Sequence, residues 1–173
     1  MADAQHEFGV ATRLDADALG EPGQRTFRLL VRSGSSSALI WIEKQELVAL
    51  AIAMEQVLEQ VAPGEVAGAE TVLRAGPVQD FPLNPTLEFR VGQLQLGHDS
   101  VNEQFDLIAS DVEQMEDGPP LPTLSVRLPY RLAGSLCQQV SALSAAGRPL
   151  CPLCGQPMGP ELHSCPLSNG HIH

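Results

Sequence analysis

Lysine is almost absent from this sequence: Lys44 is the only one, and lysine and arginine together number 10 against 21 aspartates and glutamates. The net charge at pH 7 is −11. Proteins that bind DNA or RNA do so mainly by neutralising phosphates with Lys and Arg. The composition therefore disfavours a nucleic acid as the partner of this chain.

Long apolar runs are missing as well. A membrane-spanning helix needs about 20 consecutive apolar residues, whereas the longest candidate here, residues 47–61, is broken by four Glu and Gln residues. The first ten residues have neither the basic start nor the apolar stretch of a secretory signal. We therefore expect a cytoplasmic protein with no membrane partner and with reduced thiols.

The length and apolar content indicate one folded domain with a small appendage. The chain has 173 residues, of which 43% are hydrophobic, and this is enough for one substantial core. We expect a body over residues 1–146 and a C-terminal tail over residues 147–173. In the tail Arg148 and Glu161 cancel, so the excess negative charge lies in the body.

Cysteine is scarce, yet three of the four cysteines lie in the tail. With one histidine they form the pattern C-x2-C-x8-H-x-C, which comprises Cys151, Cys154, His163 and Cys165. Thiolate and imidazole are the ligands that Zn²⁺ prefers, and it takes four of them in structural sites. The pattern predicts one tetrahedral zinc site, closed to substrate because protein ligands fill all four positions.

The local sequence favours this geometry. A two-residue gap lets the sulfurs of Cys151 and Cys154 face the same side, and Gly155 suits the tight turn that follows. One residue separates His163 from Cys165, so an extended segment would direct both side chains to one face. The tail has few large apolar residues to bury, and a segment this small usually needs a metal or a disulfide for stability.

Two alternatives for these cysteines stay open. Cys151 and Cys154 could form a redox pair, although such pairs normally stand at the start of a helix, which Pro157 and Pro160 disfavour here. Disulfides would require an oxidising compartment. Structural zinc is the interpretation that we favour.

In the body, two stretches with helical periodicity follow groups of strand-like segments. Apolar residues recur every three or four positions over residues 47–61 and again over residues 129–146, where Leu132, Leu136, Val140 and Leu143 form one face. Alternating segments predict strands over residues 7–14, 25–32, 38–42, 87–96, 104–110 and 123–128. Residues 15–23 are expected to form turns because Gly20, Pro22 and Gly23 break regular structure.

The order strand, strand, strand, helix occurs twice, which suggests an internal duplication. Weak matches link Phe8 to Phe89 and Leu50 to Leu136, which would then occupy equivalent buried sites. We expect an α+β fold with two β-β-β-α halves, about residues 5–63 and 86–146, joined by a linker over residues 64–85. Antiparallel sheets curved around two helices, related by a pseudo-twofold axis, would resemble Whirly and PUR-type domains, by analogy only.

Several stretches of this sequence carry a resemblance to a known family. They comprise residues 20–27, 43–45, 88–100 and 147–170, and the tail is the most specific, with Arg148, Pro149, Cys151, Pro152, Cys154, Pro157, His163, Cys165, Asn169 and Gly170. On these residues the chain resembles an uncharacterised bacterial family, domain of unknown function number three-thousand-and-ninety. The resemblance covers nearly the whole chain. It implies no established activity, but it implies a shared pathway with a histidine-phosphatase-like and a kinase-like protein.

The first functional hypothesis is a cytosolic adaptor that binds a partner protein and carries a structural zinc site. The rival is an enzyme with a small-molecule pocket between the two halves, and its candidate polar groups are Arg25, Glu43, His98 and Asp99. A third hypothesis is single-stranded nucleic-acid binding by the curved sheet, where Arg25, Arg28 and Arg32 could form a basic strip. The sequence favours a protein that is not an enzyme, because no set of residues meets the geometric demands of catalysis.

Four other groups of residues have simpler interpretations. Residues 97–100 (Gly-His-Asp-Ser) predict a turn rather than a hydrolase triad, because adjacent side chains cannot form one. The acidic residues between 111 and 117 lack the spacing of a calcium loop and predict a solvated loop. Cys137 falls on the apolar helix face and is expected in the core. Residues 20–25 are glycine-rich, but no helix follows them to receive a phosphate.

Overall fold

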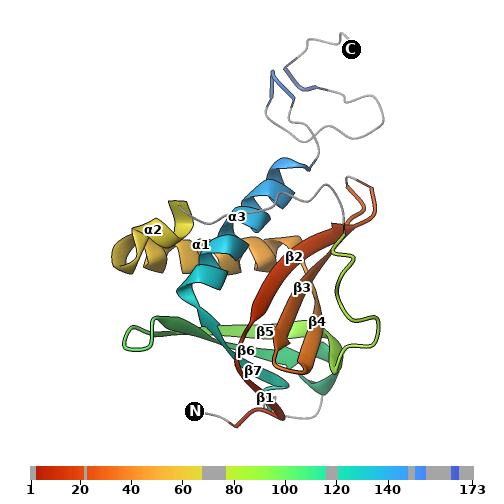
Figure 1. Ribbon diagram of the computed structural model, residues 1–173. Coiled ribbons are helices and arrows are strands. Elements are labelled where there is room, and N and C mark those ends of the chain that lie inside the picture. The colour runs from red at the N-terminus through yellow and green to blue at the C-terminus, as the bar shows by residue number, and fades with distance from the viewer. Residues whose placement is uncertain are drawn as a thin grey trace.

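In the part of the chain that the structure describes, one seven-stranded sheet lies beneath two long helices (Figure 1). The structure is a computed structural model, and it describes residues 3–21, 23–67, 77–115, 121–147, 151–154 and 165–167. The strands lie in the order β1-β7-β6-β5-β4-β3-β2. They are β1 (His6–Val10), β2 (Arg13–Leu19), β3 (Thr26–Ser33), β4 (Ser36–Ile42), β5 (Leu87–Asp99), β6 (Gln104–Asp111) and β7 (Leu124–Pro129).

The sheet curls until its two end strands meet. β1 and β2 are the first and last strands in the order, yet only Ala11 and Thr12 separate them in the chain. The amide of Ala11 donates to the Arg127 carbonyl of β7, and the amide of Thr12 donates to the Arg32 carbonyl of β3. This short crossing therefore joins the two ends of the sheet.

On the other side of the sheet, the long strand β5 makes the same connection. Its first residues, 87–90, pair in parallel with β4, and its remainder, from Val91 to Asp99, pairs antiparallel with β6. The register shifts between Val91 and Gln93, as at a β-bulge, which bends a strand and increases its twist. β5 therefore takes part in both halves of the curled sheet.

The helices cover the inner face of the sheet (Figure 1). α1 (Lys44–Val61) and α3 (Tyr130–Ala145) pack against each other, and the short α2 (Pro63–Ala67) packs against both. α2 approaches α3 so closely that a Cβ at Gly134 would collide with the Glu65 carbonyl, and the Gln138 amide donates to the Val66 carbonyl. None of the described helices is both long and apolar enough to cross a membrane.

One continuous core joins residues from both ends of the body. Phe105, Leu107, Leu124 and Leu128 of the sheet pack with Leu136 of α3, and all five are fully buried. From the first part of the chain, the core includes Leu29, Val31 and Ile40 of the sheet and Leu47, Met54 and Leu58 of α1. The mixed α+β class predicted from the sequence is confirmed.

Both predicted helices are observed, and most of the predicted strands are too. The prediction of turns over residues 15–23 is wrong, because β2 continues to Leu19. Leu14, Ala16 and Ala18 alternate with Asp15 and Asp17, so one side of β2 faces the core while the other carries carboxylates. Residues 97–99, predicted as a turn, are the last residues of β5.

On the outer face of the sheet, part of the expected linker forms a second, smaller apolar core. Val78 and Phe81 pack there on Leu30 of β3 and Leu39 of β4. The expected linker thus does more than connect, since residues 64–67 belong to α2 and Val78 and Phe81 cover this part of the outer face.

A buried ion pair fixes the outer cover to the sheet. Arg28 donates to both carboxylate oxygens of Asp17, at 2.8 and 2.6 Å. The Val78 amide donates to the same carboxylate at 2.7 Å. Asp17 therefore links β2, β3 and the segment that contains Val78.

The predicted pseudo-twofold duplication is not confirmed, and neither is the Whirly-like analogy. The chain does contain two successive meanders followed by helices, β2-β3-β4-α1 and β5-β6-β7-α3. The parallel pairing of β4 with the start of β5 has a counterpart in the parallel pairing of β7 with β1. Phe8 lies on the terminal strand β1 and is half-buried, while Phe89 lies in the middle of the sheet.

We expect Leu136→Ala to lower the free energy of unfolding by about 2–5 kcal/mol, because it leaves a cavity at a fully buried site. Leu83→Ala is the matched control, since Leu83 is 97% exposed, and it should change stability by less than about 0.5 kcal/mol. Chemical denaturation measures both. Equal effects of the two substitutions would contradict this view of the core.

Asp17→Ala should destabilise the fold by about 3–5 kcal/mol, because it leaves the Arg28 guanidinium without its partner at a nearly buried position. It should also speed hydrogen exchange at the Val78 amide, which loses its acceptor. Asp80→Ala removes a more exposed ion pair with Arg13 and should cost no more than about 1 kcal/mol. Unchanged exchange at Val78 in the Asp17 variant would refute this role.

Candidate metal centre

Three of the four predicted metal ligands lie together. The Sγ atoms of Cys151, Cys154 and Cys165 all lie within 4.8 Å of one another, although Cys165 is far from the other two in the chain. The cluster lies beyond the C-terminal end of α3, on the side away from β1 (Figure 1). Cys151 is buried, and the other two are half-buried. Such a group of thiols could hold a metal ion.

The spacing of the sulfurs suits a metal better than a disulfide. The Sγ atoms of Cys151 and Cys165 are 3.8 Å apart. A tetrahedral site with metal–sulfur bonds of about 2.3 Å has neighbouring sulfurs about 3.8 Å apart, whereas a disulfide bond measures about 2.05 Å. No disulfide joins any of the four cysteines, all of which the structure describes. The geometry therefore matches one face of a tetrahedral thiolate site.

Backbone amides favour the thiolate form of Cys151. Hydrogen bonds from the amides of Cys154 and Leu153 to its sulfur lower the pKa of Cys151 to about 6. The thiolate is the form that binds metal, and amide donors of this kind orient metal ligands and balance their charge. For Cys165, partial burial is the main cause of a raised pKa. A bound cation would favour the thiolate form of Cys165 as well.

The two arms of the cluster have the same local sequence. Cys151-Pro152-Leu153 and Cys165-Pro166-Leu167 each begin a turn, and in each the leucine amide bonds to the sulfur of the preceding cysteine. Leu153 is 53% exposed and Leu167 is 63% exposed. These two leucines were not among the predicted site residues, although the repeated Cys-Pro-Leu would have identified them.

His163, the fourth predicted ligand, lies outside the described residues, as does Gly155. The three sulfurs fit a metal without it, since they leave one corner of a tetrahedron for a further ligand. The proposed role of His163 as that ligand therefore stays a prediction.

The four candidate residues of an enzyme do not gather at one site. Arg25 donates to the Leu143 carbonyl of α3, and Glu43 lies 3.8 Å from Arg90 at the surface. Asp99 accepts hydrogen bonds from the turn at Val101 and Asn102, which lower its pKa. Within the described chain, none of these interactions joins two of the four candidates.

His98, the remaining candidate, belongs to an aromatic cluster. Its Nε2 lies 2.6 Å from the Tyr130 hydroxyl, and its ring stacks on that of Tyr130 and packs against Phe105. Burial is the main cause of a raised pKa at Tyr130. The contact links the end of β5 to the start of α3, which gives His98 a structural role in the described fold.

The other groups singled out in the sequence have structural roles where the structure describes them. Cys137 is buried and donates to the Ala51 carbonyl, and burial raises its pKa to about 11, so it belongs to the core as expected. Asp111 caps the short 3₁₀ helix η1 (Val112–Met115) by accepting from the Glu113 amide. Glu116 and Asp117 lie outside the described residues.

Of the three arginines of the expected basic strip, one is paired with a carboxylate in the described part of the chain. Arg28 is paired with Asp17 and lies over the Trp41 ring, and Arg25 is bound to α3 and lies over Phe27. Neither Arg25 nor Arg32 has a described ion pair, although Arg25 is bound to α3.

Comparison with known proteins gives one match. A protein-family model described as "Protein of unknown function (DUF3090)" matches residues 6–165, which includes the body and all four predicted ligands. Searches of the curated proteins and of the solved structures gave no match.

We expect the purified chain to carry one metal ion, and Cys151→Ser, Cys154→Ser and Cys165→Ser each to reduce its metal content severalfold, because each removes one sulfur ligand. Cys137→Ser is the matched control, since its thiol lies in the core, and it should retain the metal. Elemental analysis after gel filtration measures this. Full metal content in the Cys165 variant, or a Cys151–Cys154 disulfide under reducing conditions, would contradict the site.

Proposed function

The chain belongs to the family described as a protein of unknown function (DUF3090), and from its own residues we propose that it is a cytoplasmic adaptor that binds a partner protein through a zinc-stabilised tail. Zinc is proposed because thiolates with one imidazole are its typical structural ligands. The ligands would be Cys151, Cys154, His163 and Cys165. With all four positions filled, this zinc has no place for a substrate or a reacting water.

The exposed leucines carry the proposal. Leu153 and Leu167 stand on the two Cys-Pro-Leu turns, and each keeps more than half of its surface in contact with water. Because their cysteines lie within 4.8 Å of one another, a single metal would hold both turns and present both leucines together. Apolar side chains on a rigid support are typical of binding surfaces, since little conformational entropy is lost on association.

An enzyme in the same pathway as the family's neighbouring phosphatase-like and kinase-like proteins is less well supported. The described groove between α1 and β5 is lined by three alanines or leucines of α1 and two leucines of β5, with Glu46 as its one charged residue. Acid–base catalysis needs several polar groups that converge on one substrate. The groove is better suited to apolar side chains.

Affinity capture from a lysate of the source cells tests the adaptor function. The wild-type chain should retain a specific set of proteins, and the double variant Leu153→Ser with Leu167→Ser should lose about ten times or more of that signal, because each buried leucine is worth about 1.5–3 kcal/mol. Metal content should stay at the wild-type level in this variant. A chelator should have the same effect on capture as the substitutions.

Leu83→Ser is the control, because Leu83 is another highly exposed leucine, on a segment outside the tail. It should leave capture unchanged. If the double variant captures the same proteins as wild type, the leucines are not the binding surface. If chelation leaves capture unchanged as well, the tail has no part in it.

A further inference from the structure

Among the described residues, no strand pairs with one edge of β5 beyond Arg90. β4 pairs with β5 only over residues 87–90, and from Val91 onward β5 has a described backbone partner on one side alone, β6. A strand at the edge of a sheet presents unpaired amides and carbonyls to which another strand can bind. Residues 92–98 therefore offer a site for a further strand.

Beyond the bulge at its start, this edge lacks the charged residues and prolines that usually protect edge strands. Natural proteins place Lys, other charged residues or Pro there, or cover the edge with a helix or loop. The sequence Gly-Gln-Leu-Gln-Leu-Gly-His over residues 92–98 contains no Lys, Arg, Asp, Glu or Pro. By contrast, α3 covers the β2 edge, where Gln139 accepts from the Ala16 amide.

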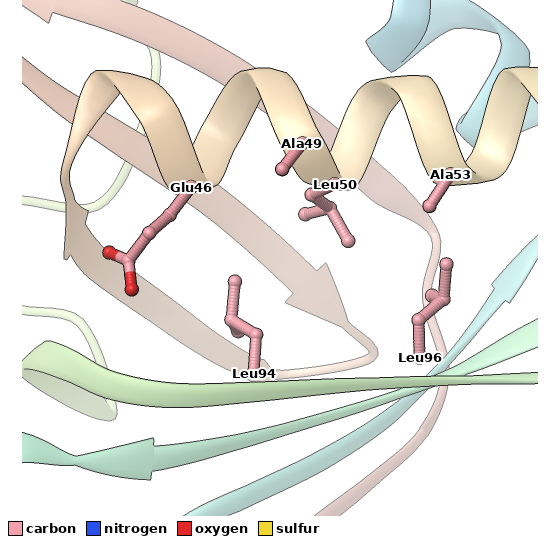
Figure 2. Close-up of a pocket in the computed structure, with 6 residues that line it drawn as sticks. All are labelled: Glu46, Ala49, Leu50, Ala53, Leu94 and Leu96. Atoms are coloured by element: carbon pink, nitrogen blue, oxygen red, sulfur yellow. The ribbon is translucent and has the colours of Figure 1, made fainter.

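An apolar groove lies directly beside the open edge. The α1–β5 groove has a volume of about 260 Å³ and is lined by Glu46, Ala49, Leu50, Ala53, Leu94 and Leu96. Figure 2 shows Leu94 and Leu96 rising from β5 toward the helix, with the two alanines above them. Pockets for whole small molecules are usually about 300–1,000 Å³, so this groove fits a few side chains rather than a complete ligand.

A carboxylate marks one end of the groove. Figure 2 shows the Glu46 side chain reaching from α1 toward β5 beside Leu94. Glu46 is half-buried, and no ion pair is found for it among the residues with described side chains. The N-terminal end of α1 stabilises this charge in part, but its oxygens remain available to a cation.

We infer that residues 92–98 of β5 bind an extended segment of a partner protein, whose alternate apolar side chains enter the α1–β5 groove and whose Lys or Arg pairs with Glu46. Main-chain hydrogen bonds would supply much of the affinity, and the groove would select the sequence, as in other cases of strand addition. The basic residue would stand at the end of the segment nearest Leu94.

A different protein fits this edge better than a second copy of the chain does. A second β5 would bring no Lys or Arg in residues 92–98 to meet Glu46. Two copies would also bring together chains of net charge −11 each, and like charges oppose association. A basic partner segment is favoured by both facts.

The inference deepens the proposed adaptor function and rests on it, because it requires a partner protein. The surface that it concerns, residues 92–98 with the α1–β5 groove, is separate from the tail. The probe is a displayed library of random peptides selected against the full-length chain. Selected peptides should share alternate apolar residues with a Lys or Arg at one end. They should slow hydrogen exchange in residues 92–98, because their backbone pairs with the open edge.

Variants of the groove make the test specific. Ala53→Leu fills the groove from an exposed helix position and should weaken the selected peptides about tenfold or more, while Gln60→Leu, on the same helix and also exposed, should not. Glu46→Arg should weaken binding similarly and should restore binding of a peptide in which Glu replaces the basic residue. That charge exchange would not occur if Glu46 served only to stabilise α1.

The outcomes separate this inference from the adaptor proposal. The double variant Leu153→Ser with Leu167→Ser should bind the selected peptides as wild type does, so a failure of the tail would leave the groove intact. Selected peptides that are insensitive to Ala53→Leu, or a library that yields none, would overturn the inference. So would a dimer that forms with rising protein concentration and that Ala53→Leu dissociates, because the edge would then belong to a second copy.

Discussion

Burial of the inner face of the curled sheet beneath α1 and α3 is the constraint on which the other features depend. The sheet can bury that face only if its ends close, and the crossing at Ala11 and Thr12 and the bent strand β5 make this closure. α3 covers the core and protects the β2 edge through Gln139. Because the apolar term is the largest favourable one in folding, the position of the β5 edge follows from this packing.

The bend in β5 has a consequence for binding. To close the sheet, β5 leaves β4 after Arg90 and continues with β6 alone. In the described part of the chain its far edge is thereby left without a pairing strand, at the place where α1 presents Ala49 and Ala53 instead of larger residues. The same strand completes the core at one end and exposes backbone groups at the other, so closure and an available edge have a common origin.

The tail depends on a different kind of stabilisation. It has too few apolar residues to form a core, and the contacts described among its parts are those of three cysteines. In the two Cys-Pro-Leu turns, the cysteine sulfurs lie close to one another and the leucine side chains are exposed. A metal that neutralises the sulfurs would therefore order the segment and display the leucines at the same time.

Local signals were sufficient for much of the fold. The helices α1 and α3 were predictable because their apolar residues recur every three to four positions. Strands β3, β4, β6 and β7 were predictable because their apolar and polar residues alternate and residues that break regular structure flank them. β2 was missed because Gly20, Pro22 and Gly23 obscured an alternation that, over residues 15–18, consists only of aspartates and alanines. Those aspartates suit a strand only because Arg28 and the Val78 amide, distant in sequence, pair with Asp17.

By itself, the sequence determined the α+β class, the two long helices, the membership of a family and the cysteines that could hold a metal, because composition, period and spacing are local properties. Only the tertiary structure decided the strand order, the open edge of β5 and the meeting of Cys165 with Cys151. The physical reason is that pairing between distant strands depends on how the whole sheet closes over its core, and no single segment carries that information.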